Sequence, residues 1–176
     1  ETNQPPTIED SFHDDKEAIK IYENEVLDFE VDAEDYDGDE ITFLWILDNE
    51  TISEKDDGEI YFDYDSSGEH ELSVTVSDGE LKTVQKWTIE VEHVNREPDV
   101  EDLKVELFET ETLKLELPTV DQDGDNLSYS FDSLLDENDE WETNYDNAGI
   151  YTIEVIANDG EYDSEIVEVT ITVVEN

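Results

Sequence analysis

The sequence predicts an all-β protein that consists of two tandem antiparallel β-sandwiches of about seven strands each. Apolar residues alternate with polar ones at a period of two in short segments along the chain, which is typical of half-buried strands. No segment carries apolar residues at helical spacing, so we expect little helix. The chain also repeats Asp35-Tyr36-Asp37-Gly38-Asp39 as Asp121-Gln122-Asp123-Gly124-Asp125, at an offset of 86 residues (121 − 35). In a chain of 176 residues this duplication predicts two domains, 1–94 and 95–176.

The first unit is predicted to begin with an extended segment and two strands. Segment 1–15 is polar, and Pro5-Pro6 favours an extended backbone there. A short edge strand is expected over 18–22. Strand 26–33 alternates with a period of two, so one face should point into the core. The residues of that face are Leu27, Phe29 and Val31.

The rest of the first unit is predicted to contain four more strands. Strand 41–47 should be central, because apolar residues occupy both of its faces. Segment 49–59 is expected to be a polar connection with weak strand character. Ser77-Asp78-Gly79-Glu80 has the composition of a hairpin turn. The other strands are expected at 60–64, 72–76 and 84–91.

The second unit repeats this order after a linker at 94–98. The offset falls from 92 between Pro6 and Pro98 to 81 between Gly68 and Gly149, so two loops of the second unit are shorter. Short strands with turn signals every 8–12 residues, roughly, predict an immunoglobulin-like sandwich for each unit. The strands of the second unit are expected at 103–107, 113–117, 127–131, 141–145, 150–157 and 167–173.

The chain is extremely acidic, with a formal charge of −47 from 55 acidic and 8 basic residues. A surface of this sign repels phosphates, so nucleic acids and anionic membranes are excluded as partners. Acidic residues such as Glu165 and Glu168 crowd the strands as well as the loops, which suits a halophilic protein working in high salt. There is no Cys to form disulfides, and the lack of Met leads us to expect a fragment of a longer protein.

The two acidic loops are candidate Ca²⁺ sites. Each places three carboxylates on alternate residues and has a glycine that permits a tight bend. Hard carboxylate oxygens at this spacing are the ligands that Ca²⁺ prefers. The alternative is a solvated acidic turn, because Asp and Gly favour turns without any metal.

The tryptophans and histidines are interpreted as structural residues. Trp45 and Trp87 lie among alternating apolar residues, and Trp141 aligns with Ile60, so core packing is favoured over a carbohydrate-stacking platform. His70 takes the corner position that a tyrosine holds in the second unit, which predicts a structural role. The three histidines are too scattered for a metal or catalytic cluster; they are His13, His70 and His93.

No enzyme is predicted. Paired carboxylates occur everywhere in so acidic a chain, so their presence does not indicate glycoside hydrolysis. No Ser or Thr lies in a nucleophile-elbow context, and no glycine-rich loop has the pattern that holds phosphate.

Several motifs resemble those of known surface modules. Phe62-Asp63-Tyr64-Asp65, followed by Asp78-Gly79, resembles the cadherin repeat, and 31–37 resembles its Ala-x-Asp-x-Asp segment. Trp45 and Gly149-Ile150-Tyr151 resemble PKD and cadherin-like Ig modules of bacteria and archaea. The short repeat favours these prokaryotic relatives, and we expect an archaeal source. The resemblance implies tandem modules of an extracellular cell-surface protein.

The cadherin resemblance also implies Ca²⁺ at the junction between the units. His93 and Arg96 stand where cadherin linkers carry aspartates, so we expect one ion rather than several. The ligands implied at the junction are Asp63, Asp65, Asn95, Asp121, Asp123, Asp125 and Asp159. The equivalent loops of the first unit have Asp35, Asp37, Asp39 and Asp78.

The expected function is that of a non-enzymatic stalk, S-layer, sheath or adhesin spacer. Its partners would be neighbouring domains of the same protein or other surface proteins, with glycans as a further candidate. One alternative is a pilus or fibre subunit in which segment 1–15 adds a strand to a neighbouring sheet. Another is a carbohydrate-binding accessory module of a surface hydrolase.

Overall fold

The computed structural model describes residues 2–14, 16–131, 134–135 and 140–175. These residues form fourteen β-strands and no helix, which confirms the all-β prediction. Thus no helix of the described chain could serve as a membrane span. The chain divides into two compact units, 1–94 and 95–176, and each is described by itself below.

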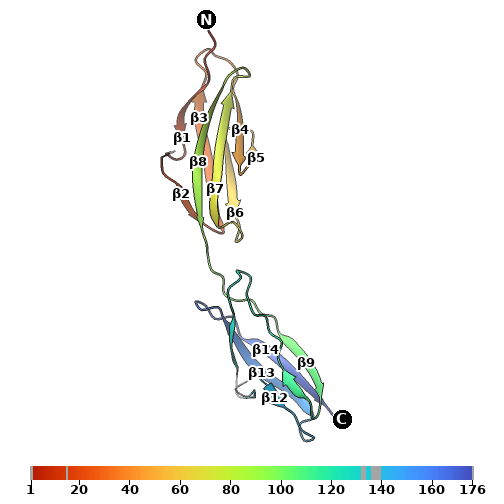
Figure 1. Cartoon of the computed structure of the whole chain (residues 1–176). Coiled ribbons are helices and arrows are strands. Elements are labelled where there is room, and N and C mark those ends of the chain that lie inside the picture. The colour runs from red at the N-terminus through yellow and green to blue at the C-terminus, as the bar shows by residue number, and fades with distance from the viewer. Residues whose placement is uncertain (1, 15, 132–133, 136–139, 176) are drawn as a thin grey trace. The chain divides into compact units, whose positions relative to one another are not determined.

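The first unit consists of a three-stranded and a five-stranded sheet (Figure 1). All strand pairs are antiparallel except β2 with β8, which is parallel. The three-stranded sheet has the order β1 (Thr7–Ser11), β3 (Glu25–Glu34), β6 (Asp57–Phe62). The five-stranded sheet has the order β2 (Ile19–Tyr22), β8 (Lys82–Glu92), β7 (Gly68–Ser77), β4 (Thr42–Leu47), β5 (Glu50–Ser53).

The core of the first unit confirms the inward face predicted for β3. Phe29 and Val31 are buried and Leu27 is partly buried against the core, because alternate side chains of a strand point to the same side of a sheet. Trp45 of β4 and Trp87 of β8 are buried too, and their rings stack with centroids 5.7 Å apart. Each indole N–H donates to a backbone carbonyl, so neither polar group is left unpaired. Core packing is therefore confirmed for both tryptophans.

The structure corrects two expectations about strands. Segment 49–59, expected as a polar connection with weak strand character, has more strand than that: it holds β5 and the start of β6. Asp48 and Asn49 adopt positive φ in the tight turn that folds β5 back onto β4. In the second unit, strand 113–117 is reduced to β10 (Thr112–Lys114), the stretch that pairs with β12.

The N-terminal segment already has a partner strand within its own unit. β1 pairs with β3 from Thr7 opposite Glu34 to Ser11 opposite Val31. The pilus alternative would need this segment to leave β3 and add to a neighbouring sheet, and it stays a prediction. The apolar residues Ile8 and Phe12 pack against the core of the unit, which favours this internal pairing.

The second unit has a four-stranded and a two-stranded sheet. β14 pairs with β13 in antiparallel fashion and with β9 in parallel fashion. Trp141 packs edge-on against Tyr151, with ring centroids 4.8 Å apart, beside a core that includes Val155 and Ile171. The larger sheet has the order β11 (Ser128–Phe131), β13 (Gly149–Asn158), β14 (Val167–Val174), β9 (Leu103–Phe108). The smaller sheet joins β10 to β12 (Glu140–Glu142).

Each unit contains the same kind of corner contact within itself, which confirms the structural role predicted for His70. Tyr151 donates its hydroxyl to the Asn147 carbonyl at 3.0 Å. His70 stands 81 residues earlier (151 − 70), and its Nε2 lies 2.7 Å from the carbonyl of Ser66, which stands 81 residues before Asn147 (147 − 66). The same backbone corner is thus tied by two different side chains.

His70 should make the stability of the first unit depend on pH. Its Nδ1 lies 2.6 Å from Asp48 Oδ2, so both ring nitrogens face acceptors and only the imidazolium can donate to both. Burial opposes the charge, but the hydrogen bonds to Asp48 and Ser66 raise the pKa of His70 above its ordinary value. Because the pKa of His70 is higher in the folded state, its charged form stabilises the folded unit. This stabilisation is fully present below the unfolded-state pKa and is lost as pH rises through the folded-state pKa.

His70→Tyr supplies the comparison, because Tyr keeps a donor at the corner but does not titrate near neutrality. We expect the advantage in Tm of the wild-type chain over this variant to shrink as the pH is raised from about 6 to about 9. Thermal unfolding followed by circular dichroism would measure it. Parallel Tm curves for the two proteins would contradict the prediction.

Candidate cation site at the acidic loops

The acidic loop of the first unit is folded by its own first aspartate. Asp35 Oδ1 accepts hydrogen bonds from the backbone N–H of Asp37 at 2.9 Å and of Asp39 at 3.2 Å. Gly38 completes the bend with φ of 83°, which glycine adopts without strain. The other carboxylate oxygen, Asp35 Oδ2, is buried and has no hydrogen-bond partner among the described residues.

The acidic loop of the second unit has the same geometry. Asp121 Oδ1 accepts from the N–H groups of Asp123 at 2.8 Å and Asp125 at 2.9 Å. Asp121 Oδ2 is again buried without a partner in the described chain. The repeated sequence therefore encodes a repeated loop that leaves one carboxylate oxygen unsatisfied.

An asparagine near the start of each unit binds the aspartate of a second turn. Asn3 donates from Nδ2 to Asp78 Oδ2 at 3.0 Å, and Asn95 donates to Asp159 Oδ2 at 3.0 Å. Asn3 and Asn95 are 92 residues apart (95 − 3), the offset of the two prolines that follow them. The amide oxygen of Asn95 is buried and unpaired among the described residues.

The aspartates of the two hairpin turns are held in the charged form. Hydrogen bonds from backbone N–H groups lower the pKa of both side chains. The largest effect on the pKa of Asp78 comes from the N–H of Leu81, and the largest effect on the pKa of Asp159 comes from the N–H of Tyr162. The contacts are 2.6 Å from Leu81 and 2.7 Å from Tyr162. A carboxylate that accepts several N–H groups ionises readily, so both turns present a fixed negative charge.

The residue after each asparagine adds a third contact. The backbone N–H of Gln4 donates to Asp37 Oδ2 at 2.8 Å, and that of Arg96 donates to Asp123 Oδ2 at 2.8 Å. Among the described residues, a side-chain contact is added in the second unit alone, where the Arg96 guanidinium also binds Asp123 Oδ1. Each unit thus gathers an asparagine, two loop aspartates and a turn aspartate.

The oxygens gathered in each unit fit a hard cation in part. A buried oxygen without a partner costs about 1–3 kcal/mol, and a cation would remove that cost. Within the described ranges, no three His, Cys, Asp or Glu side chains form a group that could hold a metal ion. A bound Ca²⁺ would therefore need an amide oxygen such as that of Asn95, together with backbone or water oxygens, which Ca²⁺ accepts.

The structure places the remaining predicted ligands differently. Asp39 and Asp125 are exposed and contribute their backbone N–H groups to the loops. Asp63 and Asp65 lie in the turn after β6 of the first unit, where Asp63 Oδ1 accepts from the Ser66 hydroxyl at 2.7 Å and from Asp65 N–H at 3.1 Å. The Ser66 contact lowers the pKa of Asp63. That these residues share an ion with the second unit stays a prediction.

Sequence reasoning missed a buried glutamate in each unit. Glu23 is 2% exposed and Glu109 is 3% exposed. Glu23 Oε1 accepts from Ser67 N–H at 3.0 Å, and Glu109 Oε1 accepts from Ala148 N–H at 3.3 Å. The offset of 86 (109 − 23) that relates the acidic loops also relates these two glutamates, so a longer comparison of the repeats would have found them.

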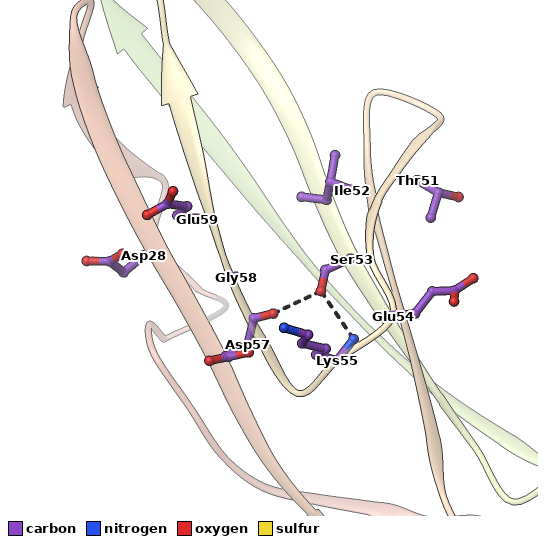
Figure 2. Close-up of a pocket in the computed structure, with 9 residues that line it drawn as sticks. All are labelled: Asp28, Thr51, Ile52, Ser53, Glu54, Lys55, Asp57, Gly58 and Glu59. Atoms are coloured by element: carbon purple, nitrogen blue, oxygen red, sulfur yellow. Dashed lines mark hydrogen bonds between the residues drawn. The ribbon is translucent and has the colours of Figure 1, made fainter.

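A hollow of the described surface lies at one edge of the first unit, between β5 and β6 (Figure 2). It is an open groove that is rich in carboxylates. Its Ser53 hydroxyl donates to the Asp57 carbonyl at 2.9 Å and accepts from Lys55 N–H at 3.1 Å. These contacts fix the turn between the strands and do not pair Ser53 with a base. The lining residues are Asp28, Thr51, Ile52, Ser53, Glu54, Lys55, Asp57, Gly58 and Glu59.

Comparisons with known proteins agree with this architecture. The family model described as "Bacterial Ig domain" matches residues 3–91. No curated protein matches the chain. The Drosophila N-cadherin EC1-4 structure matches with a TM-score of 0.55 and 16% identity, over 97% of this chain and 50% of that one. This chain thus spans half the length of that fragment, and at this identity the likeness concerns the fold alone.

Two other solved structures contain tandem modules of similar length. Human protocadherin-24 EC1-2 matches with a TM-score of 0.47 and 18% identity, over 90% of this chain and 95% of that one. The fibronectin(III)-like modules of Clostridium thermocellum CbhA match with a TM-score of 0.39 and 15% identity, over 97% and 94% of the two chains. The family match and the fold shared with N-cadherin confirm the resemblance to cadherin-like and immunoglobulin-like modules.

Proposed function

Because the chain belongs to the bacterial Ig domain family, we propose that it is a non-enzymatic pair of modules from the extracellular part of a larger cell-surface protein. Its role is to space or stiffen a stalk, sheath, S-layer or adhesin. Its partners are the neighbouring domains of that protein or other surface proteins. The fold supports this role, since both units are small sandwiches and the aspartates that the two units repeat lie in loops between strands.

We further propose that each unit binds Ca²⁺ at its acidic loop. The observation that carries this proposal is the buried, unpaired carboxylate oxygen at the same position of both repeats, Asp35 Oδ2 and Asp121 Oδ2. In the second unit, Asp121, Asn95 and Asp159 would hold the ion. Bound there, Ca²⁺ would supply positive charge among carboxylates that repel one another.

The chain's own residues explain why such an ion would stiffen a unit. Asn95 lies ahead of the first strand of its unit, and its contact with Asp159 ties that leading segment to the β13–β14 turn. Arg96 N–H ties the same segment to Asp123 of the acidic loop. A ligand shared by these three segments would restrict their separate movement, and binding only to the ordered state stabilises it.

The test is thermal unfolding and calorimetry of the full chain with Ca²⁺ at moderate salt. We expect a stabilisation of about 2.7 kcal/mol when free Ca²⁺ is about 100 times its dissociation constant. The double variant Asp35→Asn, Asp121→Asn should lose this response. Mg²⁺ should act more weakly, because it demands a tighter octahedron and releases its waters reluctantly.

A matched control separates the loops from general charge reduction. Glu69→Gln with Glu154→Gln removes one exposed carboxylate from β7 and one from β13, so it also changes the net charge by two. This variant should respond to Ca²⁺ like the wild-type chain. Absence of Ca²⁺ binding in the wild type, or an equal loss in both double variants, would refute the calcium proposal.

A further inference from the structure

The two acidic loops differ in what neutralises their middle aspartate. In the second unit, the Arg96 guanidinium donates from Nε to Asp123 Oδ1 at 2.7 Å and from Nη2 to the same oxygen, while Nη2 also reaches the Gln122 carbonyl at 3.1 Å. The Asp123 side chain is only 1% exposed. In the first unit, Gln4 stands at the position of Arg96 (4 + 92 = 96), and it contacts Asp37 through its backbone N–H.

We propose that the residue after the leading asparagine sets the cation affinity of each unit, with Arg96 acting as a built-in cation that weakens divalent binding in the second unit. This inference rests on the proposed function, because it concerns the same loops. It adds that the two repeats are not equivalent sites. The first unit, with Gln4, is the stronger site for a divalent cation such as Ca²⁺.

The carboxylates gathered in each unit, Asp35, Asp37 and Asp78 in the first cluster and Asp121, Asp123 and Asp159 in the second, support a stronger cation site in the first unit. Asp35, Asp37 and Asp78 give the first cluster three carboxylates with no cationic side chain on Asp37 among the described contacts. The second cluster has three matching carboxylates, but one of them is paired with a guanidinium. A nearby positive charge opposes the approach of a second cation, and burial of the pair reduces screening by solvent.

Arginine is well suited to hold this position permanently. Its guanidinium stays protonated throughout the physiological range and matches a carboxylate with several N–H groups. Both Asp123 oxygens accept from Arg96, one from the backbone and one from the side chain. A cation that used Asp123 as a ligand would have to displace Arg96 first. The remaining buried acceptors of the second cluster are Asp121 Oδ2 and Asn95 Oδ1.

The experiment is a CaCl₂ titration of the ¹⁵N-labelled full chain by NMR at constant ionic strength. Gly38 and Gly124 each lie inside one acidic loop, so their amide signals report the two sites separately. In the wild-type chain we expect the Gly38 signal to reach its midpoint at about tenfold lower Ca²⁺ than the Gly124 signal.

Exchange of the two residues tests the assignment. Arg96→Gln should lower the Gly124 midpoint by about tenfold and leave Gly38 unchanged. Gln4→Arg should raise the Gly38 midpoint by a similar factor, and this variant does not depend on removing a buried partner. Arg96→Lys is the conservative control: it keeps the positive charge and should stay close to the wild type.

The outcomes separate this inference from the proposed function. If both glycine signals reach their midpoints at the same Ca²⁺ concentration and neither exchange alters this, the role proposed for Arg96 is overturned. The signals would still show that Ca²⁺ binds, so the calcium proposal would stand. A tighter second site, or a Gly124 midpoint that rises in Arg96→Gln, would also overturn it. If neither glycine responds to Ca²⁺, both the built-in cation and the calcium proposal fail.

Discussion

Replacing Phe29 by Ala should lower the free energy of unfolding of the first unit by about 3–5 kcal/mol, as truncation of a buried aromatic residue does. Phe29 is 2% exposed, and its ring centroid lies 4.4 Å from that of Trp45. Truncation removes this contact and leaves a cavity between the sheets. Urea unfolding followed by tryptophan fluorescence would measure the effect, because Trp45 and Trp87 both lie in this core.

A neighbouring position provides a sharper test of the same packing. A Cβ added at Gly58 of β6 would overlap the Phe29 ring, with Cε2 at 2.8 Å. Gly58→Ala should therefore cost about 1–3 kcal/mol in the wild-type chain but almost nothing in the Phe29→Ala background. Val26→Ala on β3, the strand of Phe29, is the control, since Val26 is 52% exposed. Additive effects of the changes at 29 and 58, or a loss below about 1 kcal/mol for Phe29→Ala, would contradict this packing.

Glu23→Ala should destabilise the first unit by about 2–4 kcal/mol. The Glu23 side chain is fully buried, and its Oε2 lies 2.8 Å from both Val94 N and His93 Nδ1. Its Oε1 accepts from Ser67 N–H at 3.0 Å. Without the carboxylate, the backbone donors of Ser67 and Val94 lose their acceptor in a partly buried site. Glu69→Gln, on an exposed position of β7, should change stability by less than about 0.5 kcal/mol.

The pH dependence of the Glu23 effect has a definite sign. Burial opposes ionisation, but the hydrogen bonds from Val94, His93 and Ser67 outweigh it and lower the pKa of Glu23. Because the pKa of Glu23 is lower in the folded state, its charged form stabilises the folded unit. This stabilisation is fully present above the unfolded-state pKa and is lost as pH falls through the folded-state pKa. The stability gap between the wild type and Glu23→Ala should thus narrow in acid. A gap that widens on acidification would show that the carboxylate is not held charged.

The strands that could be predicted are those with a strict pattern. Strand β3 alternates without interruption, so the burial of Phe29 and Val31 followed from spacing alone. Strand β5 could not be found in this way: Glu50-Thr51-Ile52-Ser53 is polar because it is an edge strand, and its pairing with β4 depends on a turn at Asp48 and Asn49. Pairing is non-local, so an edge strand leaves little trace in its own sequence.

The candidate site was predictable where the chain repeats itself. Comparison of the repeats identified Asp35 and Asp121, and the structure gives these two residues the same hydrogen bonds. Arg96 was noticed only as a departure from cadherin linkers. Its partner Asp123 stands 27 residues later, and only the fold brings the two together. Side-chain pairs of this kind depend on loop conformation, which composition does not specify.

The parallel pairing of an early strand with the last strand of each unit has a mechanical consequence. In the first unit β2 pairs with β8 over four positions, and in the second unit β9 pairs with β14 over six. Tension applied to the two ends of a unit pulls the members of such a pair in opposite directions along their length. Their hydrogen bonds are then loaded in shear and must break together rather than one at a time. Resistance to pulling is governed by the unfolding rate, so each unit can bear load well beyond what its equilibrium stability suggests.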